Sequence, residues 1–318
     1  LLFGGCILKE PLFLFDGHCD TPVELWLREQ PLRENHLAVS LEQAKPLGAW
    51  AQFFAICTPW IQNKLPHTEQ YRQALEYFLT QLDENRDAIT LCRTAAEAKH
   101  AMQSGKRAAF LAIEGAEALR CDPGRLDEAY EQGVRMISLV WNLENALGGS
   151  CQTGTGLTAQ GKEFFRRAQK LGMLVDVSHL SERGFWDMAE LAERPIVASH
   201  SNSAAVCPHP RNLTDEQFRT ICQLGGTAGI NLYPPFLTQE NGAAVEDVYR
   251  HIAHFLQLGG EGHIAIGTDF DGCETLPEGI GGIRDMPWLA DALLQRGMDE
   301  QTVRKIFGQS LWKVVENI

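Results

Sequence analysis

Short apolar runs alternate with longer segments of helical spacing along the whole chain. Eight of these runs are apolar on both faces, as buried parallel strands are, and we predict strands at Leu12–Phe15, Trp50–Cys57, Ala108–Ile113, Met136–Val140, Leu174–Val177, Ile196–Ser199, Thr227–Leu232 and Ile264–Gly267. The spacing between them predicts helices at Thr68–Glu84, Ala95–Gln103, Leu126–Gln132, Thr158–Leu171, Ser181–Leu191, Thr214–Leu224 and Val245–Leu258. This order is typical of βα units arranged around a parallel sheet.

Eight βα units in a chain of 318 residues favour a closed barrel over an open doubly wound sheet. We therefore predict an α/β fold of the (β/α)8 TIM-barrel class, in a single domain that spans residues 1–318. Three of the predicted helices begin after a capping hydroxyl, at Thr158, Ser181 and Thr214. The last stretch, Gln301–Ile318, is expected to form one or two helices that close the outer layer of the barrel.

The chain is acidic, with 28 Lys and Arg against 41 Asp and Glu and a formal net charge of −13. A surface of this charge repels phosphate backbones and anionic headgroups, and no local basic patch offsets it, so we expect neither nucleic acid nor membrane as a partner. The longest apolar stretches fall short of the roughly 20 residues that a membrane span needs. Nine dispersed cysteines without a CxxC pair predict reduced thiols, a cytoplasmic location and no structural zinc of the ribbon kind.

Polar side chains that bind metals follow five of the predicted strands. In a parallel barrel these positions converge at the C-terminal face, where active sites are built. Each one alone has an ordinary explanation, since a lone histidine is more often a core or cap residue and a His-x-Asp triplet arises by chance. Together they indicate a metal centre, and the candidates are His18 and Asp20 after the first strand, Glu114 after the third, His179 after the fifth, His200 after the sixth and Asp269 after the eighth.

The number of candidate ligands indicates two metal ions. A mononuclear zinc site usually holds about three protein ligands and a water, and His18, Asp20, His179 and His200 already exceed that number. His18 and Asp20 are two positions apart, so an extended segment points both the same way. Two ions need a bridging carboxylate, and Glu114 is the best candidate because the fourth strand ends without a lysine. The alternative for Glu114 is an acid in the first turn of a helix.

Further residues are candidates for chemistry or substrate contact. Asp269 is not needed as a ligand, which makes it the candidate for proton transfer. Asp176 and Asp271 lie near predicted ligands and are expected to orient a histidine or to cap a loop. Arg211 follows the sixth strand and is the candidate for binding a substrate carboxylate through two parallel hydrogen bonds, with a surface salt bridge as the alternative. Tyr233 is expected to line the pocket or to pack beside it.

Seven motifs occur in a fixed order from about Phe13 to the C-terminal helix: Asp16-Gly17-His18-Cys19-Asp20-Thr21, Ile113-Glu114-Gly115, Gly133-Val134-Arg135, Asp176-Val177-Ser178-His179, Ile196-Val197-Ala198-Ser199-His200-Ser201, Arg211-Asn212 and Gly267-Thr268-Asp269-Phe270-Asp271-Gly272. As a set they resemble the membrane (renal) dipeptidase family of zinc peptidases, in particular its bacterial branch of soluble members. The resemblance implies a barrel of the metal-dependent amidohydrolase type with two Zn2+ per chain, bridged by a glutamate and a hydroxide. Members of the family are often dimers, so a homodimer is expected.

Carried over by position, the resemblance implies a role for each candidate. The first zinc ion would be held by His18, Asp20 and Glu114, the second by Glu114, His179 and His200, the terminal carboxylate of the substrate by Arg211, and the transferred proton by Asp269.

The chain departs from the mammalian members of that family at two places. They have a histidine at the end of the fourth strand, proposed to polarise the scissile carbonyl, where this chain has Trp141 followed by Asn142. That role falls either to a hydrogen bond from Asn142 or to the metal alone. The glutamate motif also differs, with Ala116 and Glu117 in place of glycine and histidine.

The expected function is hydrolysis of the peptide bond of dipeptides, L-D as well as L-L, by a binuclear zinc-dependent dipeptidase in which a metal-bridging hydroxide attacks the carbonyl. An alternative is another amidohydrolase-type hydrolase that acts on N-acyl amino acids, cyclic amides or lactones, since fold and metals do not fix the substrate. A second alternative is a metal-binding scaffold without catalysis, which the full ligand set together with Asp269 argues against.

Overall fold

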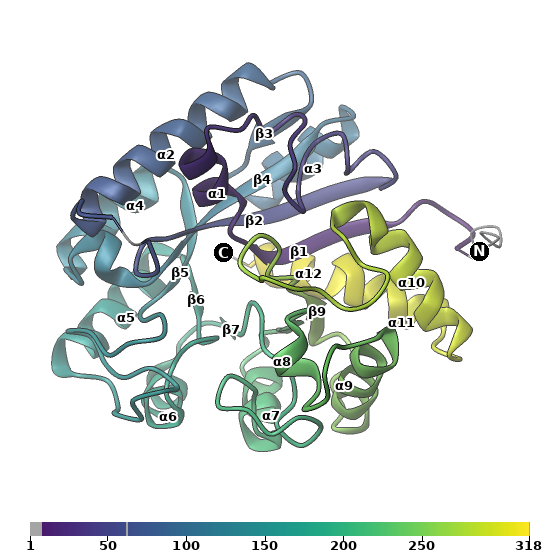
Figure 1. Cartoon of the computed structure of the whole chain (residues 1–318). Helices are drawn as coiled ribbons and strands as arrows, with labels where there is room; N and C mark the ends of the chain where they lie inside the picture. The colour runs from purple at the N-terminus through teal and green to yellow at the C-terminus, as the bar shows by residue number, and fades with distance from the viewer. Residues whose placement is uncertain (1–7, 62, 318) are drawn as a thin grey trace.

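Eight parallel strands form a nearly closed barrel in the computed structural model, which describes residues 8–61 and 63–317 (Figure 1). Neighbouring strands follow the order β7, β6, β5, β4, β2, β1, β9 and β8. Their bounds are Phe13–Cys19 (β1), Ala49–Cys57 (β2), Arg107–Glu114 (β4), Val134–Ser138 (β5), Leu174–Asp176 (β6), Ile196–Val197 (β7), Ala228–Ile230 (β8) and Ile264–Ile266 (β9). β7 and β8 meet through a parallel bridge between Ala198 and Ala228. The predicted TIM barrel is confirmed.

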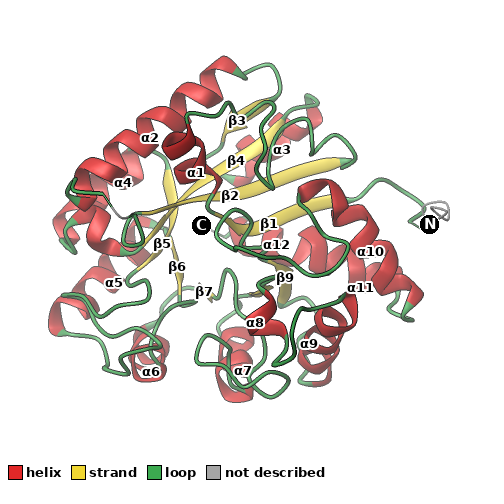
Figure 2. Ribbon diagram, viewed as in Figure 1, coloured by secondary structure: helices red, strands yellow, loops and turns green. Residues whose placement is uncertain are grey.

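Most of the helices surround the strands on the outside of the barrel (Figure 2). Their bounds are Thr21–Arg28 (α1), His67–Glu84 (α2), Ala95–Gln103 (α3), Leu126–Glu131 (α4), Ala159–Leu171 (α5), Glu182–Leu191 (α6), Asp215–Gln223 (α7), Pro234–Leu237 (α8), Val245–Gln257 (α9), Met286–Gln295 (α10), Glu300–Arg304 (α11) and Ser310–Val315 (α12). The predicted caps Thr158, Ser181 and Thr214 each accept a backbone hydrogen bond from the first turn of α5, α6 and α7. The sequence patterns missed the helices α1, α8 and α10. They also missed the short strand β3 (Ile89–Leu91), which pairs with β4 outside the barrel.

Two apolar layers cover the two faces of the sheet. The outer layer packs the strands against the helices. The inner layer contains the rings of Phe15, Phe53 and Phe110, which pack together with centroids 5.2 to 5.6 Å apart. α12 adds Leu311 and Val314 to this inner layer. The sequence places the C-terminal helices in the outer layer, whereas α12 packs inward because these two apolar side chains face the interior of the barrel.

A bulge in β1 turns His18 into the barrel. Phe15 belongs to the inner layer, and strict alternation would place Cys19 on the same side and His18 on the opposite one. The pairing of β1 with β2 shifts register between Asp16 and Cys19, and Cys19 packs in the outer layer. The bulge therefore reverses the alternation and re-aims a side chain next to the site, a common use of bulges.

Three glycines leave room inside the barrel for the backbone of Ser199. A Cβ atom at Gly17, Gly229 or Gly267 would lie 2.9, 2.0 or 1.8 Å from the carbonyl oxygen of Ser199. Only glycine permits so close an approach of one backbone to another. Because His200 follows Ser199, its ring comes to rest 3.9 Å from the ring of His18, centroid to centroid.

Some expectations reach beyond the part of the chain that the structure describes. Residues 1–7, Gln62 and Ile318 of the predicted domain lie outside it, and the single domain stays a prediction. Within residues 8–61 and 63–317, no helix has the length and apolar character that a membrane crossing requires. The eight cysteines of this part are free thiols.

Candidate active site

The predicted metal ligands come together at the C-terminal ends of the strands. His18 lies in β1, and Glu114 is the last residue of β4. Nε2 of His18 lies 3.4 Å from Oδ2 of Asp20, 3.7 Å from Oε2 of Glu114 and 3.9 Å from Oδ1 of Asp269. The first three side chains are buried, whereas the side chain of Asp269 is 14% exposed.

Glu114 faces two groups of ligands with its two oxygens. Oε2 points toward His18, while Oε1 lies 2.8 Å from Nε2 of His179 and 3.4 Å from Nε2 of His200. The two Nε2 atoms of His179 and His200 lie 3.1 Å apart. Three sets of potential ligand atoms lie within 4.8 Å of one another: His18, Asp20 and Glu114; Glu114, His179 and His200; His18, His200 and Asp269.

The hydrogen bonding of this cluster fits a bound metal. Among the described residues, neither ring nitrogen of His18 nor Oδ1 of Asp20 has a hydrogen-bond partner, although all three atoms are buried. Buried polar atoms without partners are costly and rare in folded proteins. Imidazole nitrogens and carboxylate oxygens are ligands for divalent cations such as Zn2+. The residues present therefore fit a metal centre that would satisfy these atoms.

The electrostatics of the cluster point the same way. Burial raises the pKa of both Asp20 and Glu114, so these carboxylates lack the stabilisation that water gives a charge. Burial also lowers the pKa of His179 and His200 well below the ordinary value, which keeps both imidazoles neutral and able to bind a cation. Burial opposes protonation of His18 too, but the surrounding carboxylates, Glu114 first, raise its pKa to about 10. Without a metal ion, a proton on His18 therefore balances the negative charge of these carboxylates, and a bound cation would replace that proton.

Asn142 contacts a ligand rather than standing free in the pocket. Its Oδ1 lies 2.9 Å from Nδ1 of His179. A histidine that offers Nε2 to a metal carries its proton on Nδ1, so this nitrogen donates to the Asn142 carbonyl oxygen. The predicted donor to the substrate is thus also the residue that orients His179.

Asn231 was not found from the sequence, although it holds Asp269. Nδ2 of Asn231 donates to Oδ2 of Asp269 at 2.9 Å. Asn231 follows the last residue of β8, Ile230, and the rule that polar residues at strand ends meet in the site would have identified it. Asp269 adopts a φ of +61°, a conformation that is strained for a residue with a side chain and that is often found at functional sites.

Asp271, by contrast, connects the first residue of α1 with the loop that contains Ala38. Its carboxylate accepts hydrogen bonds from Oγ1 of Thr21 and the backbone nitrogen of Ala38, both at 2.7 Å. Burial raises its pKa to about 6. This arrangement matches the predicted loop-capping role.

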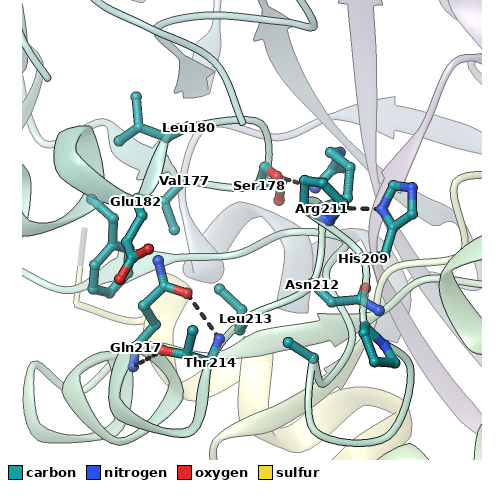
Figure 3. Close-up of a pocket in the computed structure, with 14 residues that line it drawn as sticks. Val177, Ser178, Leu180, Glu182, His209, Arg211, Asn212, Leu213, Thr214 and Gln217 are labelled. Carbon is teal, nitrogen blue, oxygen red and sulfur yellow. Dashed lines mark hydrogen bonds between the residues drawn. The ribbon is translucent and has the colours of Figure 1, made fainter. Parts of the chain in front are cut away.

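Arg211 reaches the cluster from the loop after β7. The residue is 5% exposed, and its guanidinium donates to the carbonyl oxygen of Ser178 (Figure 3). The guanidinium also lies 3.2 Å from Nε2 of His179. Among residues 8–61 and 63–317 no carboxylate lies within salt-bridge distance of it, and its buried Nε has no hydrogen-bond partner. The surface salt bridge considered for Arg211 is therefore wrong. A buried guanidinium that has no carboxylate partner and lies at a cavity is suited to an anionic group of a ligand.

A cavity of about 450 Å³ opens over the cluster. Its lining includes Asp20, Glu114, His179, Asp269, Arg211, Asn142, Tyr233, Trp60 and Trp141. This volume lies within the range of small-molecule sites. Arg211 also lines a second cavity of about 340 Å³ between α6 and α7, which Figure 3 shows. The predicted pocket residues Tyr233 and Asn142 thus share one cavity with the ligand cluster.

Known proteins resemble this chain over most of its length. The sequence model of the family described as membrane dipeptidase (peptidase family M19) matches residues 7–318. An uncharacterized protein in the pqqA 5′ region of Klebsiella pneumoniae is 36% identical over 242 residues, which cover 72% of this chain and 89% of that protein.

Two solved structures share the fold closely. A metallo peptidase from Rhodobacter sphaeroides, liganded with a phosphinate mimic of the dipeptide L-Ala-D-Ala, is 30% identical with a TM-score of 0.88, covering 97% of this chain and 99% of that one. A second structure, dipeptidase AC, is a metallo peptidase of family M19 that is 31% identical, with a TM-score of 0.88 and coverage of 97% and 99%. The chain belongs to the membrane dipeptidase family, peptidase family M19, and is a metal-dependent hydrolase.

Proposed function

We propose that the chain is a binuclear zinc dipeptidase. The observation that carries this proposal is the position of Glu114, whose oxygens face His18 and Asp20 on one side and His179 and His200 on the other. A carboxylate shared by two sets of ligands is what a two-ion hydrolytic site requires. In this proposal His18, Asp20 and Glu114 hold one zinc ion, and Glu114, His179 and His200 hold the other.

Bound zinc ions supply Lewis acidity, which activates water and polarises a carbonyl group. The remaining tasks fall to residues of this chain. Asp269 takes a proton from the attacking water and passes it to the leaving nitrogen, and its partial exposure to the cavity supports this role. Arg211 binds the terminal carboxylate of the dipeptide, for which a buried guanidinium without a carboxylate partner is suited.

Two further residues contact the substrate in this proposal. Oδ1 of Asn142 accepts a hydrogen bond from His179, which leaves Nδ2 of Asn142 as a donor for the substrate carbonyl oxygen. Tyr233 forms part of the cavity wall, and its ring packs edge-on against Phe236 with centroids 5.0 Å apart. These two contacts would replace the histidine that polarises the scissile carbonyl in the mammalian members of the family, which this chain lacks at the end of β5.

The proposed substrates include dipeptides with a D-residue at the C-terminus. The Rhodobacter sphaeroides relative, whose ligand mimics L-Ala-D-Ala, supports this choice at 30% identity over nearly the whole chain. Both stereoisomers carry the free carboxylate that Arg211 would bind, so L-L dipeptides are proposed as substrates too.

The test is hydrolysis of matched L-L and L-D dipeptides by the purified, zinc-loaded protein, with zinc per chain counted on the same sample by mass spectrometry. N-acyl amino acids, cyclic amides and lactones form the comparison panel. Dipeptide cleavage at close to two zinc ions per chain is the expected result. Two ions without dipeptide cleavage would contradict the proposed substrate and favour the comparison panel, and one ion per chain would contradict the binuclear site.

A cytoplasmic location is part of the proposal. The free thiols of the eight described cysteines support it, because reducing compartments preserve such thiols. The expected homodimer stays a prediction, which light scattering coupled to size-exclusion chromatography would measure.

A further inference from the structure

A buried carboxylate lies next to one half of the cluster of proposed metal ligands. Asp176, at the end of β6, is 2% exposed and accepts hydrogen bonds from three serines. Oδ1 accepts from the backbone nitrogen and Oγ of Ser178 at 3.0 and 2.6 Å and from the backbone nitrogen of Ser199 at 2.8 Å. Oδ2 accepts from Oγ of Ser199 at 2.6 Å and from Oγ of Ser138 at 3.0 Å. These bonds link β5, β6 and the end of β7 through one side chain.

Two of these serines pass the contact on to His200. Oγ of Ser199 lies 2.7 Å from Nδ1 of His200, and Oγ of Ser178 accepts from the backbone nitrogen of His200 at 3.1 Å. Since both hydroxyls donate to Asp176, each has its lone pairs free to accept from His200. The ring and the backbone of this ligand are therefore fixed to the same carboxylate.

The third serine differs in one useful respect. Ser138 donates to the same Oδ2 atom of Asp176 as Ser199 does, but no hydrogen bond joins it to His200 among those found in the described residues. It offers a substitution that weakens the support of Asp176 without touching the ligand.

The opposite side of Ser199 is fixed by the barrel itself. Its carbonyl oxygen lies in the space left by Gly17, Gly229 and Gly267. Ser199 is thus held from both sides, by close packing on one and by hydrogen bonds on the other. Among the hydrogen bonds of the described residues, Oγ of Ser199 is the only partner of Nδ1 of His200.

We propose that Asp176, acting through Ser199, positions His200 and fixes the ring tautomer that presents Nε2 to a metal ion. The inference rests on the proposed function only in taking His200 as a ligand. Groups that hold the second nitrogen of a ligating histidine typically change metal affinity about 10- to 100-fold when they are removed. Asp176 and Ser199 are positioning residues, since neither reaches the cavity.

The experiment is a zinc titration of the full chain against a chromophoric chelator, comparing the wild type with Ser199→Ala, Asp176→Asn and the control Ser138→Ala. Ser199→Ala is expected to weaken zinc binding at one of the sites about 10- to 100-fold, while Ser138→Ala stays within about twofold of the wild type. Asp176→Asn is expected to show the same loss, because an amide nitrogen cannot accept the hydrogen bonds of the serines. Thermal unfolding of the metal-free forms provides the reference for folding.

A cobalt-substituted sample gives a second readout, because the visible absorption of Co2+ reports the geometry of its ligands. Ser199→Ala is expected to change this absorption and Ser138→Ala to leave it as in the wild type. Equal zinc affinity in Ser199→Ala and the wild type would overturn the proposal, and so would an equal loss in Ser138→Ala. Neither readout uses a peptide, so a wild-type chain that binds zinc but cleaves no dipeptide would refute the proposed function and leave this inference standing.

Discussion

Nδ2 of Asn231 lies 2.9 Å from Oδ2 of Asp269 and fixes this carboxylate at the edge of the cluster of proposed metal ligands. The other oxygen, Oδ1, lies 3.9 Å from Nε2 of His18 and is the atom that would carry the proton in the proposed mechanism. The backbone of Asp269 adds to this arrangement, since its nitrogen donates to the carbonyl oxygen of His18 at 3.2 Å in a left-handed conformation. An acid that is held this firmly by one oxygen is preorganised for proton transfer by the other.

Replacing Asn231 tests this arrangement without removing the acid. Asn231→Ala is expected to lower kcat about 10- to 100-fold while zinc content stays as in the wild type, because Asp269 keeps its charge but loses its orientation. Steady-state kinetics on a dipeptide together with metal analysis measures both quantities. A variant that loses zinc in proportion to its activity would show instead that Asn231 supports the metal site.

Asp269→Asn removes the carboxylic acid but keeps the size and shape of the side chain. The amide cannot accept a proton at neutral pH, so kcat is expected to fall about 10²- to 10⁴-fold, the usual contribution of general acid–base catalysis. Both zinc ions should remain bound, since the proposed ligands are untouched. Near-normal turnover in this variant would exclude Asp269 from proton transfer.

Arg211→Lys separates charge from geometry. A lysine keeps the positive charge but cannot form two parallel hydrogen bonds with a carboxylate, so KM is expected to rise at least tenfold with kcat changed less. The control lies in the substrate, as a dipeptide with a C-terminal carboxamide offers no carboxylate. Wild type and variant should differ little on that substrate. An equal loss on both substrates would mean that Arg211 does not act on the substrate carboxylate. It would act elsewhere, for instance by holding His179, whose Nε2 lies 3.2 Å from the guanidinium.

The proposed ligands could be predicted from the sequence because of one geometric rule. Residues that follow parallel strands converge at one face of a barrel, so the order of strands along the chain suffices to group His18, Glu114 and His200. The strand pattern was readable for a related reason, since buried parallel strands are apolar on both faces.

What the sequence did not reveal depends on contacts between distant segments. The bulge that turns His18 inward shows only in the register of β1 against β2. Asn142 was expected to face the substrate, yet its contact with His179 needs two loops to be placed side by side. The inward packing of α12 was missed because a short amphipathic helix has the same apolar periodicity whether it covers the outside of a barrel or fills its end.

Metal removal is expected to destabilise the fold. A ligand that binds only the folded state adds about 2.7 kcal/mol when its concentration is one hundred times Kd, so stripping both ions with a chelator should lower Tm by about 5–10 °C. Added zinc should restore the original value. Glu114→Gln provides the control, because a variant without the shared carboxylate should show a much smaller difference between the two forms. Equal Tm values for loaded and stripped wild type would argue against the metal centre.

His251 gives the fold a pH dependence that is separate from the metal cluster. Its Nδ1 accepts a hydrogen bond from the backbone nitrogen of Ser203, and its Nε2 donates to the carbonyl oxygen of Leu237, both at 3.0 Å. Burial lowers the pKa of His251 to about 4, from an ordinary value of 6.5. Because the folded state binds the proton less readily than the unfolded chain, this contribution to stability is complete above pH 6.5 and is lost as the pH falls toward 4.

The expected size of the effect is about 2 kcal/mol between pH 7 and pH 5. Urea unfolding of chelated wild type and His251→Gln at both values measures it, and chelation removes the contribution of bound metal. The stability advantage of the wild type over the variant should shrink by about this amount at pH 5, since only the wild type carries the titrating ring. His100→Gln, at an exposed position of α3, controls for the loss of an imidazole from the surface. A wild-type advantage that stays constant between the two pH values would show that His251 is protonated in the fold as readily as in the unfolded chain.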